Sequence, residues 1–228
     1  MKRSFVNAEL HAFAELLDKH CIKLPPFAFF SPEEWKQKFS KNSEYDEIRQ
    51  NNLGWDLTDF GSGDYMKVGL TLFTIRNGNP KNPADKKPYA EKIMRVYENQ
   101  VTPYHFHWSK MEDIINRGGG NLIVKLYNST EDDKFDTTDV TVKVDGRHYT
   151  IPAGGTVTLT PGESTTLCQR QYHSFWAEEG AGICLVGEVS KVNDDNTDNR
   201  FYEEAGRFPP IEEDEPSRYV LCNEYDSL

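Results

Sequence analysis

The first pattern along the chain is a run of apolar residues at helical spacing near the N-terminus. It comprises Val6, Leu10, Phe13, Leu16 and Leu17. Residues three and four apart share one face of a helix, so this run predicts an amphipathic helix whose apolar face packs on the rest of the chain. Ser4 is the expected N-cap, and the two prolines in residues 24–27 are expected to end the helix.

A capping box predicts a second helix. Ser31 and Glu34 are three residues apart, and Pro32 stands at the first helical position between them. The helix is expected to include Trp35 and Phe39. The polar run that follows, residues 41–52, has no pattern that distinguishes helix from loop.

From Met66 onward the pattern changes to short apolar runs separated by turn residues. Strands are predicted at residues 69–75, 89–96, 101–108, 121–127, 140–144, 148–151, 156–160, 164–167, 171–177 and 183–189. Asp145 and Gly146 form a hairpin signal between two of these runs. Short strands with frequent turns are typical of an all-β sandwich or barrel.

The C-terminal region is acidic but also rich in aromatic residues. Acidic runs occupy residues 193–196, 203–204 and 212–215, and residues 219–222 resemble a strand. The aromatic residues are Phe201, Tyr202, Phe208, Tyr219 and Tyr225. Disordered tails seldom contain so many apolar groups, so we expect this region to pack back on the barrel.

The predicted organisation is a single domain in three segments. Residues 1–65 form an N-terminal helical segment, residues 66–190 a β-barrel core, and residues 191–228 a C-terminal extension. A chain of 228 residues is long enough for one large β domain with such extensions.

Composition and charge exclude several classes of partner. The net charge of −11 without a Lys/Arg cluster argues against nucleic acid and anionic membranes, and no apolar run has the length of a membrane span. The N-terminus lacks the apolar core and cleavage site of a signal peptide, so a cytoplasmic location is expected. Four scattered cysteines are expected to be reduced thiols: Cys21, Cys168, Cys184 and Cys222.

The clearest candidate chemistry lies in residues 102–112. His105 and His107 are two apart in an aromatic run that favours a strand, so both imidazoles point to one face. Glu112 lies five residues after His107, and an odd separation would place it on the opposite face of one continuous strand. A turn at residues 109–111 must therefore bring Glu112 back to the side of the two histidines, at the start of the next strand. Two imidazoles and a carboxylate suit Zn, Fe, Mn, Co or Ni, and open coordination positions would make the site catalytic.

An HxH pair alone is equally consistent with two polar residues on a strand, so the surrounding residues decide its interpretation. Glu112 is followed by Gly118, Gly119 and Gly120, which permit a tight turn, and then by another predicted strand. The spacing of HxH, four residues, Glu and then glycine resembles the first motif of the cupin family. The resemblance implies a fourth ligand from a later strand.

His173 is the candidate for that fourth ligand, because it follows Gly162 at the separation of the second cupin motif. The chain departs from the cupin motifs at Asn99 and Arg170, where the motifs have Gly, at Cys168, where they have Pro, and at Ala177, where they have Asn. These departures leave the turn before His173 uncertain. The remaining histidines are expected to be surface or packing residues: His11, His20 and His148.

Longer stretches of the chain resemble the D-lyxose isomerases, which are aldose–ketose isomerases built on a cupin barrel. The similar stretches are residues 24–27, 31–35, 53–56, 69–78, 89–94, 101–108, 112–124, 172–177, 185–190 and 221–225. The resemblance implies a jelly-roll-like barrel, a homodimer, and a divalent metal, usually Mn²⁺ with Co²⁺, Zn²⁺ or Fe²⁺ as alternatives. The implied metal ligands are His105, His107, Glu112 and His173.

The implied reaction converts D-lyxose to D-xylulose and, more slowly, D-mannose to D-fructose. A base removes the proton at C2, a cis-enediol forms, and the metal polarises the carbonyl. Lys110 occupies the family's lysine position before the metal glutamate, where it would stabilise the oxyanion or move a proton between the sugar oxygens. From the residues alone, a solvated turn lysine is the favoured interpretation of Lys110.

Glu188 is the first candidate for the base because it is a carboxylate inside an otherwise apolar strand. If it faces the barrel interior it would be half-buried and costly unless paired, whereas an outward Glu188 would be an ordinary edge residue. Asp198, Glu204 and Arg207 lie in the extension that would cap the barrel mouth, so they are weaker candidates for sugar binding.

Two other classes of function remain open from the sequence. A metal-dependent cupin oxygenase would use the same kind of ligands around an open iron site. A non-catalytic sugar-binding cupin would bind a pentose without turnover. The intact ligand set and Lys110 favour the isomerase.

Overall fold

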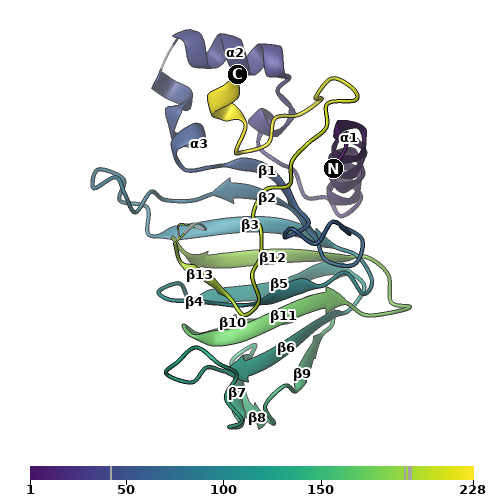
Figure 1. Cartoon of the computed structure of the whole chain (residues 1–228), viewed down its shortest axis with the longest axis vertical. Helices are drawn as coiled ribbons and strands as arrows, with labels where there is room; N and C mark the ends of the chain where they lie inside the picture. Colours follow the sequence, from purple (N-terminus) through teal and green to yellow (C-terminus); the bar gives the residue numbers. More distant parts are fainter. Residues whose placement is uncertain (42, 193, 195–196) are drawn as a thin grey trace.

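Two antiparallel β-sheets and a layer of helices make up the protein in a computed structural model, which describes residues 1–41, 43–192, 194 and 197–228 (Figure 1). The larger sheet has the order β1 (Gly54–Thr58), β2 (Leu70–Arg76), β3 (Tyr89–Val96), β12 (Cys184–Lys191), β5 (Glu112–Gly119), β10 (Ser164–Leu167), β7 (Val140–Val144) and β8 (Arg147–Ile151). The smaller has the order β13 (Asn199–Phe201), β4 (Thr102–His107), β11 (Gln171–Ala177), β6 (Leu122–Asn128) and β9 (Thr156–Leu159). This arrangement confirms the predicted all-β jelly-roll-like fold.

The two sheets enclose an apolar core. It includes Leu72, Met94, Leu126, Val142, Phe175 and Val186, which are all buried. Strands β5 and β7 alternate buried and more exposed positions, as expected for sheets with one face on the core. Several of these core residues, including Leu72, Met94 and Phe175, also line the cavity at the polar site described below.

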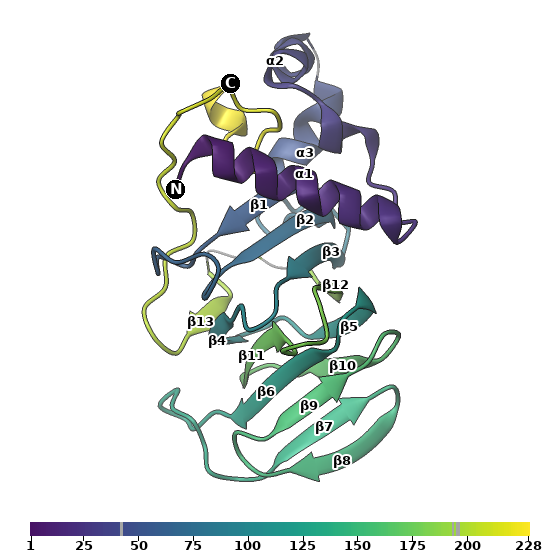
Figure 2. The same ribbon diagram turned by 90° about the vertical axis from the view of Figure 1, so that its right-hand side faces the viewer.

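The helices lie at the β1 end of the larger sheet (Figure 2). They are α1 (Arg3–Lys19), η1 (Pro26–Phe29), α2 (Pro32–Lys41), η2 (Ser43–Tyr45) and α3 (Asp46–Gln50). Helix α1 packs its predicted apolar face on the outer side of this sheet, where Phe13 contacts Trp55 edge to face. The backbone N–H of Ser31 donates to the Glu34 carboxylate, and the backbone N–H of Glu34 donates to the Ser31 hydroxyl oxygen, which confirms the capping box of α2.

Three predictions for the N-terminal segment are wrong. Helix α1 begins at Arg3, and the Ser4 hydroxyl donates to Asp214 instead of capping the helix. The helix ends at Lys19, before the prolines, and Cys21 follows with φ of 59°. The β region begins at β1 instead of Met66; apolar Trp55 and Leu57 alternate there with polar Asp56 and Thr58, but all of these residues are buried, so the polar face of this strand is not a solvent face.

The C-terminal extension packs on both the sheet and α1, as predicted, but its local structure differs from the expectation. Strand β13 pairs with β4, whereas residues 219–222 form only a bridge between Leu221 and Trp55. A short helix, η3 (Tyr225–Ser227), ends the chain. Of the acidic run 193–196, residues 193, 195 and 196 lie outside the described residues. The four cysteines are free thiols, as predicted.

A search of the described helices finds none with the length and apolar character needed to cross a membrane.

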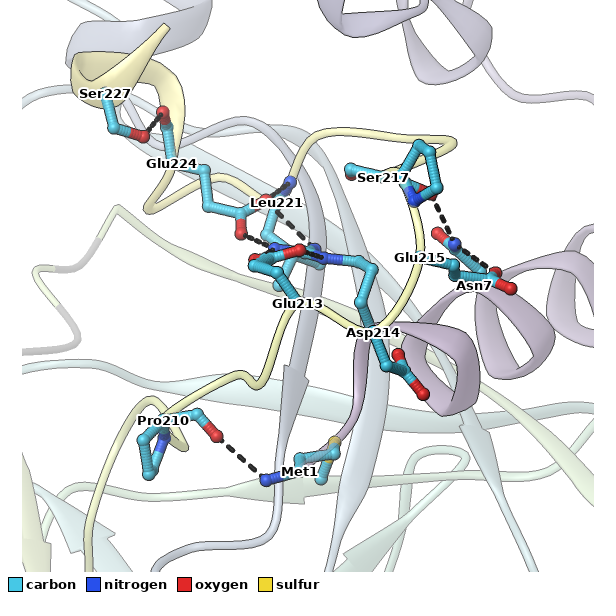
Figure 3. A network of polar contacts seen from close by, with 12 residues as sticks. Met1, Asn7, Pro210, Glu213, Asp214, Glu215, Ser217, Leu221, Glu224 and Ser227 are labelled. Carbon is cyan, nitrogen blue, oxygen red and sulfur yellow. Dashed lines mark hydrogen bonds and ion pairs between the residues drawn. The ribbon is translucent and has the colours of Figure 1, made fainter.

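A network of polar contacts joins α1 to the extension (Figure 3). Arg3 is 3% exposed, and its guanidinium donates to Glu213 in a bidentate pair at 2.7 and 2.9 Å and also to Glu224. Asn7 donates to Glu215 at 2.6 Å, and the Met1 amino group donates to a backbone carbonyl of the extension at 2.8 Å. We call these contacts the terminal network. It comprises residues 1–7, which include the first turn of α1, and residues 210–224 of the extension, and it holds the extension against the helix.

Replacing Arg3 tests how much the terminal network contributes to the free energy of unfolding. Because a buried guanidinium with two carboxylate partners is removed, we expect Arg3→Met to lower the free energy of unfolding by about 2 kcal/mol, measured by urea denaturation. The control is Arg147→Met, whose ion pair with Glu163 is largely exposed, and it should change stability by less than about 0.5 kcal/mol. Equal effects of the two substitutions would contradict the role of the network.

Candidate active site

Polar side chains cross the inner face of the larger sheet at one end of the sandwich. In the register of the sheet, Lys92 on β3 is opposite Glu188 on β12, and Ser190 on β12 is opposite Glu112 on β5. Because alternate residues of a strand share a face, Glu188 and Ser190 point to the same interior. The structure places Glu188 inward at 5% exposure, the direction that its candidacy as the base requires.

Three histidines of the smaller sheet point into the same interior. His105 and His107 lie on β4, and His173 on β11 is paired directly opposite His105. One ring nitrogen from each of the three lies within 4.8 Å of the others. The HxH pair and the later histidine therefore converge, as the sequence predicted.

Hydrogen bonds to the backbone fix the orientation of two of these rings. Nδ1 of His105 lies 2.9 Å from the carbonyl oxygen of Pro103, and Nδ1 of His173 lies 3.0 Å from that of Gln171. A carbonyl oxygen only accepts, so both Nδ1 atoms bear the proton and both Nε2 atoms present a lone pair to the interior. This is the orientation that metal-binding histidines adopt.

Glu112 lies against the histidines from the opposite sheet. Its Oε1 is 3.2 Å from Nε2 of both His107 and His173. Among the described residues, Nε2 of His173 has no hydrogen-bond partner despite this contact. The lone pairs of Nε2 of His173 and Oε1 of Glu112 therefore face each other without a proton between them. Such an arrangement suits a cation, so the residues present fit a divalent metal.

The charge states of these groups also fit a metal. Burial lowers the pKa of His105 well below its usual value, and the neighbouring His173 and His107 lower it further. Burial and the Lys110 ammonium lower the pKa of His107. Burial alone would raise the pKa of Glu112, but Lys110 and His107 outweigh it and hold that pKa well below its usual range. Neutral imidazole and ionised carboxylate are the ligand forms of these residues.

Lys110 joins the two carboxylates of the interior. Its Nζ lies 2.6 Å from Oε2 of Glu112 and 3.0 Å from Oε1 of Glu188, and the residue is 2% exposed. Oε1 of Glu188 also accepts from the Ser190 hydroxyl at 3.0 Å and lies 3.5 Å from Nζ of Lys92. A solvated turn lysine is therefore excluded for Lys110.

Asp198 positions the turn that contains Lys110. Its Oδ1 accepts from the backbone N–H and hydroxyl of Ser109 at 2.8 Å, and its Oδ2 accepts from the backbone N–H of Lys110 at 3.0 Å. Both carboxylate oxygens are thus directed at the turn, and Asp198 does not line the cavity that the site encloses. The extension therefore orients Lys110 through the backbone.

The cavity at the site has a volume of about 70 Å³. It is lined by His105, His107, Lys110, Glu112, Glu188, Lys92, Thr58, Phe60, Leu70, Leu72, Met94, Thr102, Ile114, Phe175, Asn199, Phe201 and Arg207. Arg207 reaches it as predicted, whereas Glu204 is exposed and does not line it. Sequence reasoning missed Lys92 and Asn199. The signal for Lys92 was a lysine two residues from Ala90 and two from Met94, both apolar and on the same face of the strand.

At two positions where the cupin motifs have glycine, this chain has another residue but keeps the backbone conformation that favours glycine. Asn99 and Arg170 both adopt φ of 59°, the left-handed conformation that favours glycine. The Arg170 N–H donates to the carbonyl of His107 at 2.9 Å, and its guanidinium donates to Asp133 at 2.8 Å. The turn before His173, which the sequence left uncertain, is therefore formed and held by hydrogen bonds.

The fold and the site together define a cupin with a candidate metal centre. Residues 1–225 match the family described as D-lyxose isomerase. A protein of Serratia proteamaculans, "D-lyxose/D-mannose isomerase", is 52% identical over 225 residues, which cover 99% of this chain and 98% of the relative. A protein of Escherichia coli O157:H7 with the same name is 51% identical over the same shares. The chain belongs to the D-lyxose isomerase family.

Solved structures with the same fold are more distant in sequence. An L-ribose isomerase of Cellulomonas parahominis without ligand has a TM-score of 0.61 at 14% identity, over 93% of this chain and 98% of that one. An L-ribose isomerase of Geodermatophilus obscurus has a TM-score of 0.62 at 14% identity over the same shares. The family match confirms a sugar isomerase and disfavours the oxygenase and the non-catalytic cupin.

Removing one histidine tests the metal centre. We expect the purified protein to hold about one divalent ion per chain and His173→Ala to lose most of it, because the substitution removes one of three converging ring nitrogens. His148→Ala, an exposed residue on β8, is the control and should keep the ion. Elemental analysis of dialysed proteins measures this, and equal metal contents in all three would show that the site is misassigned.

Proposed function

We propose that this protein is an aldose–ketose isomerase that interconverts D-lyxose and D-xylulose and, more slowly, D-mannose and D-fructose. The observation that carries this proposal is the buried pair of Lys110 and Glu188 beside three histidines and Glu112, in one cavity. The reaction is redox-neutral. It needs one group that transfers a proton, and it needs a positive charge placed near the sugar oxygens. Relatives about half identical over the full chain are named for both aldoses.

The proposed metal ligands are His105, His107, His173 and Glu112. These residues would hold a divalent ion, which would supply the positive charge that polarises the sugar carbonyl. We favour Mn²⁺ because the sequence resemblance implies it. Lys110 neutralises the second oxygen of Glu112, so the ligand carboxylate is oriented by a cation on one side and by histidines on the other.

Glu188 is the proposed base. It lies on the cavity wall, and its Oε1 accepts hydrogen bonds from the hydroxyl of Ser190 and from Nζ of Lys110, which fix the position of the carboxylate. In the proposed step the carboxylate takes the proton from C2, the electron pair of that bond forms the C1–C2 double bond, and the carbonyl pair moves to O1, which gains a proton to give the enediol. O2 then loses its proton as the C2 carbonyl forms, and the electron pair of the double bond takes the proton back from Glu188 at C1. Each proton that leaves the sugar is matched by one that it gains, so no oxidant is needed.

Lys110 is the proposed electrophile. Its ammonium is fixed between the two carboxylates and lies on the cavity wall. From that position it stabilises negative charge on a sugar oxygen as the C2 proton leaves, or transfers a proton between O1 and O2. The predicted homodimer and cytoplasmic location stay predictions that follow from the resemblance and the composition.

Lys110→Ala should separate catalysis from metal binding. We expect kcat to fall by about 10²-fold or more because charge stabilisation acts mainly in the transition state, with a smaller change in KM. Metal content should stay near that of the unsubstituted protein, which elemental analysis checks. Lys67→Ala, which removes an exposed lysine, is the matched control and should keep the original kcat. A native kcat for Lys110→Ala would remove this residue from the mechanism.

Glu188→Gln should abolish most turnover while preserving shape. Glutamine fills the same volume but is not a base, so we expect kcat with D-lyxose to fall by about 10²-fold or more. Circular dichroism and metal content verify the fold, and Glu163→Gln, in a loop on the larger sheet's β10 side, is the control. A near-native rate would place the base elsewhere. The proposed function itself fails if metal-loaded protein converts neither aldose to a ketose.

A further inference from the structure

A second cavity of about 180 Å³ adjoins the cavity at the metal centre. Most of its lining side chains are polar, and they include Asp56, Thr74, Lys92 and Arg207. Only Lys92 and Arg207, of the described residues, line both cavities. The two cavities therefore meet at these two cationic side chains, and the second has more than twice the volume of the first.

The strand register shows that polar residues continue from one cavity to the other. Glu188 on β12 is opposite Lys92 on β3, and Lys92 is opposite Thr74 on β2. Thr74 is opposite Gly54 on β1, and Asp56 lies two residues further along the same face. A row of side chains with hydrogen-bonding groups thus leads from the candidate base across three strands to Asp56.

Asp56 and Arg207 form an ion pair on the wall of the second cavity. Asp56 is 1% exposed, and its Oδ2 accepts from Arg207. Its other oxygen, Oδ1, is buried and has no hydrogen-bond partner among the residues that the structure describes. A buried carboxylate oxygen without a donor is costly, so a ligand that brings a hydroxyl donor to this place gains free energy.

We propose that this second cavity is a distal subsite that binds the terminal hydroxyl groups of the open-chain sugar, and that Asp56 and Arg207 set the acceptance of a hexose relative to a pentose. The proposal rests on the proposed isomerase function. The reacting carbons lie at the metal centre, and the rest of the sugar passes Lys92 and Arg207. Asp56 compensates the charge of Arg207, so the subsite suits neutral hydroxyls, which both accept and donate, better than a phosphate.

A comparison of D-lyxose with D-mannose measures the contribution of the distal subsite. D-mannose has the configuration of D-lyxose at C2, C3 and C4 and adds one carbon with its hydroxyl. A hexose therefore extends further from the metal than a pentose, and its terminal hydroxyl groups depend more on the distal residues. Sites that hydrogen-bond a substrate hydroxyl discriminate strongly between sugars that do and do not present it.

The test compares kcat/KM for D-lyxose and D-mannose in the metal-loaded protein, Asp56→Asn and Arg207→Lys. Asparagine keeps the shape of Asp56 but loses its charge, and lysine keeps the charge of Arg207 but loses the planar fork. We expect each variant to lower kcat/KM for D-mannose by about tenfold more than for D-lyxose. Asp133→Asn, which breaks a matched pair with Arg170 outside both cavities, should leave the ratio unchanged.

The outcomes separate the two proposals. Equal losses for both sugars, or a greater loss for D-lyxose, would overturn the subsite while leaving the isomerase intact. An unsubstituted protein that turns over D-mannose 6-phosphate better than D-mannose would overturn the preference for neutral hydroxyls. Absence of turnover with every sugar would instead overturn the isomerase itself. If Asp56→Asn does not fold, the ratio for Arg207→Lys decides alone.

Discussion

The site depends on the pairing of four buried charges in a protein interior, two ammonium groups and two carboxylates. Lys110 lies between Glu112 and Glu188, and Lys92 lies beyond Glu188. Removing ions from water is costly, and such groups are tolerated only when partners surround them. In this arrangement each carboxylate has a cation within 3.0 Å, so the polar row is stable beside the apolar core of the sandwich.

Holding Lys110 in place requires residues distant in sequence. Its turn is fixed by the carboxylate of Asp198, and strand β13 follows immediately and pairs with β4 beside the histidines. Further along, Arg207 lines the cavity, and the extension then reaches the network around Arg3. The N-terminal helix therefore contacts the far part of the extension, whose first residues orient the turn that contains Lys110, although α1 itself lies outside the sandwich.

Much of the metal centre was predictable from local patterns. Strand periodicity alone places His105 and His107 on one face, and motif spacing adds Glu112 and His173. Strand periodicity alone does not determine the direction of Glu188, because its strand has apolar residues on both faces. Asp56 was missed because the β region was expected to begin at Met66, although Trp55 and Leu57 alternate with Asp56 and Thr58 in β1. The contacts of Asp198 join segments almost ninety residues apart in sequence, and no local pattern encodes them.

The central claim is that Glu188, paired with Lys110, moves a proton at C2 of the sugar. The most direct measurement is the rate at which D-xylulose is converted in D₂O to D-lyxose labelled at C2, followed by NMR for the metal-loaded protein and for Glu188→Gln. The account predicts deuterium at C2 with the unsubstituted protein and a rate at least about 10²-fold lower with Glu188→Gln. Equal rates of labelling in the two proteins, or equal turnover without any label, would contradict it.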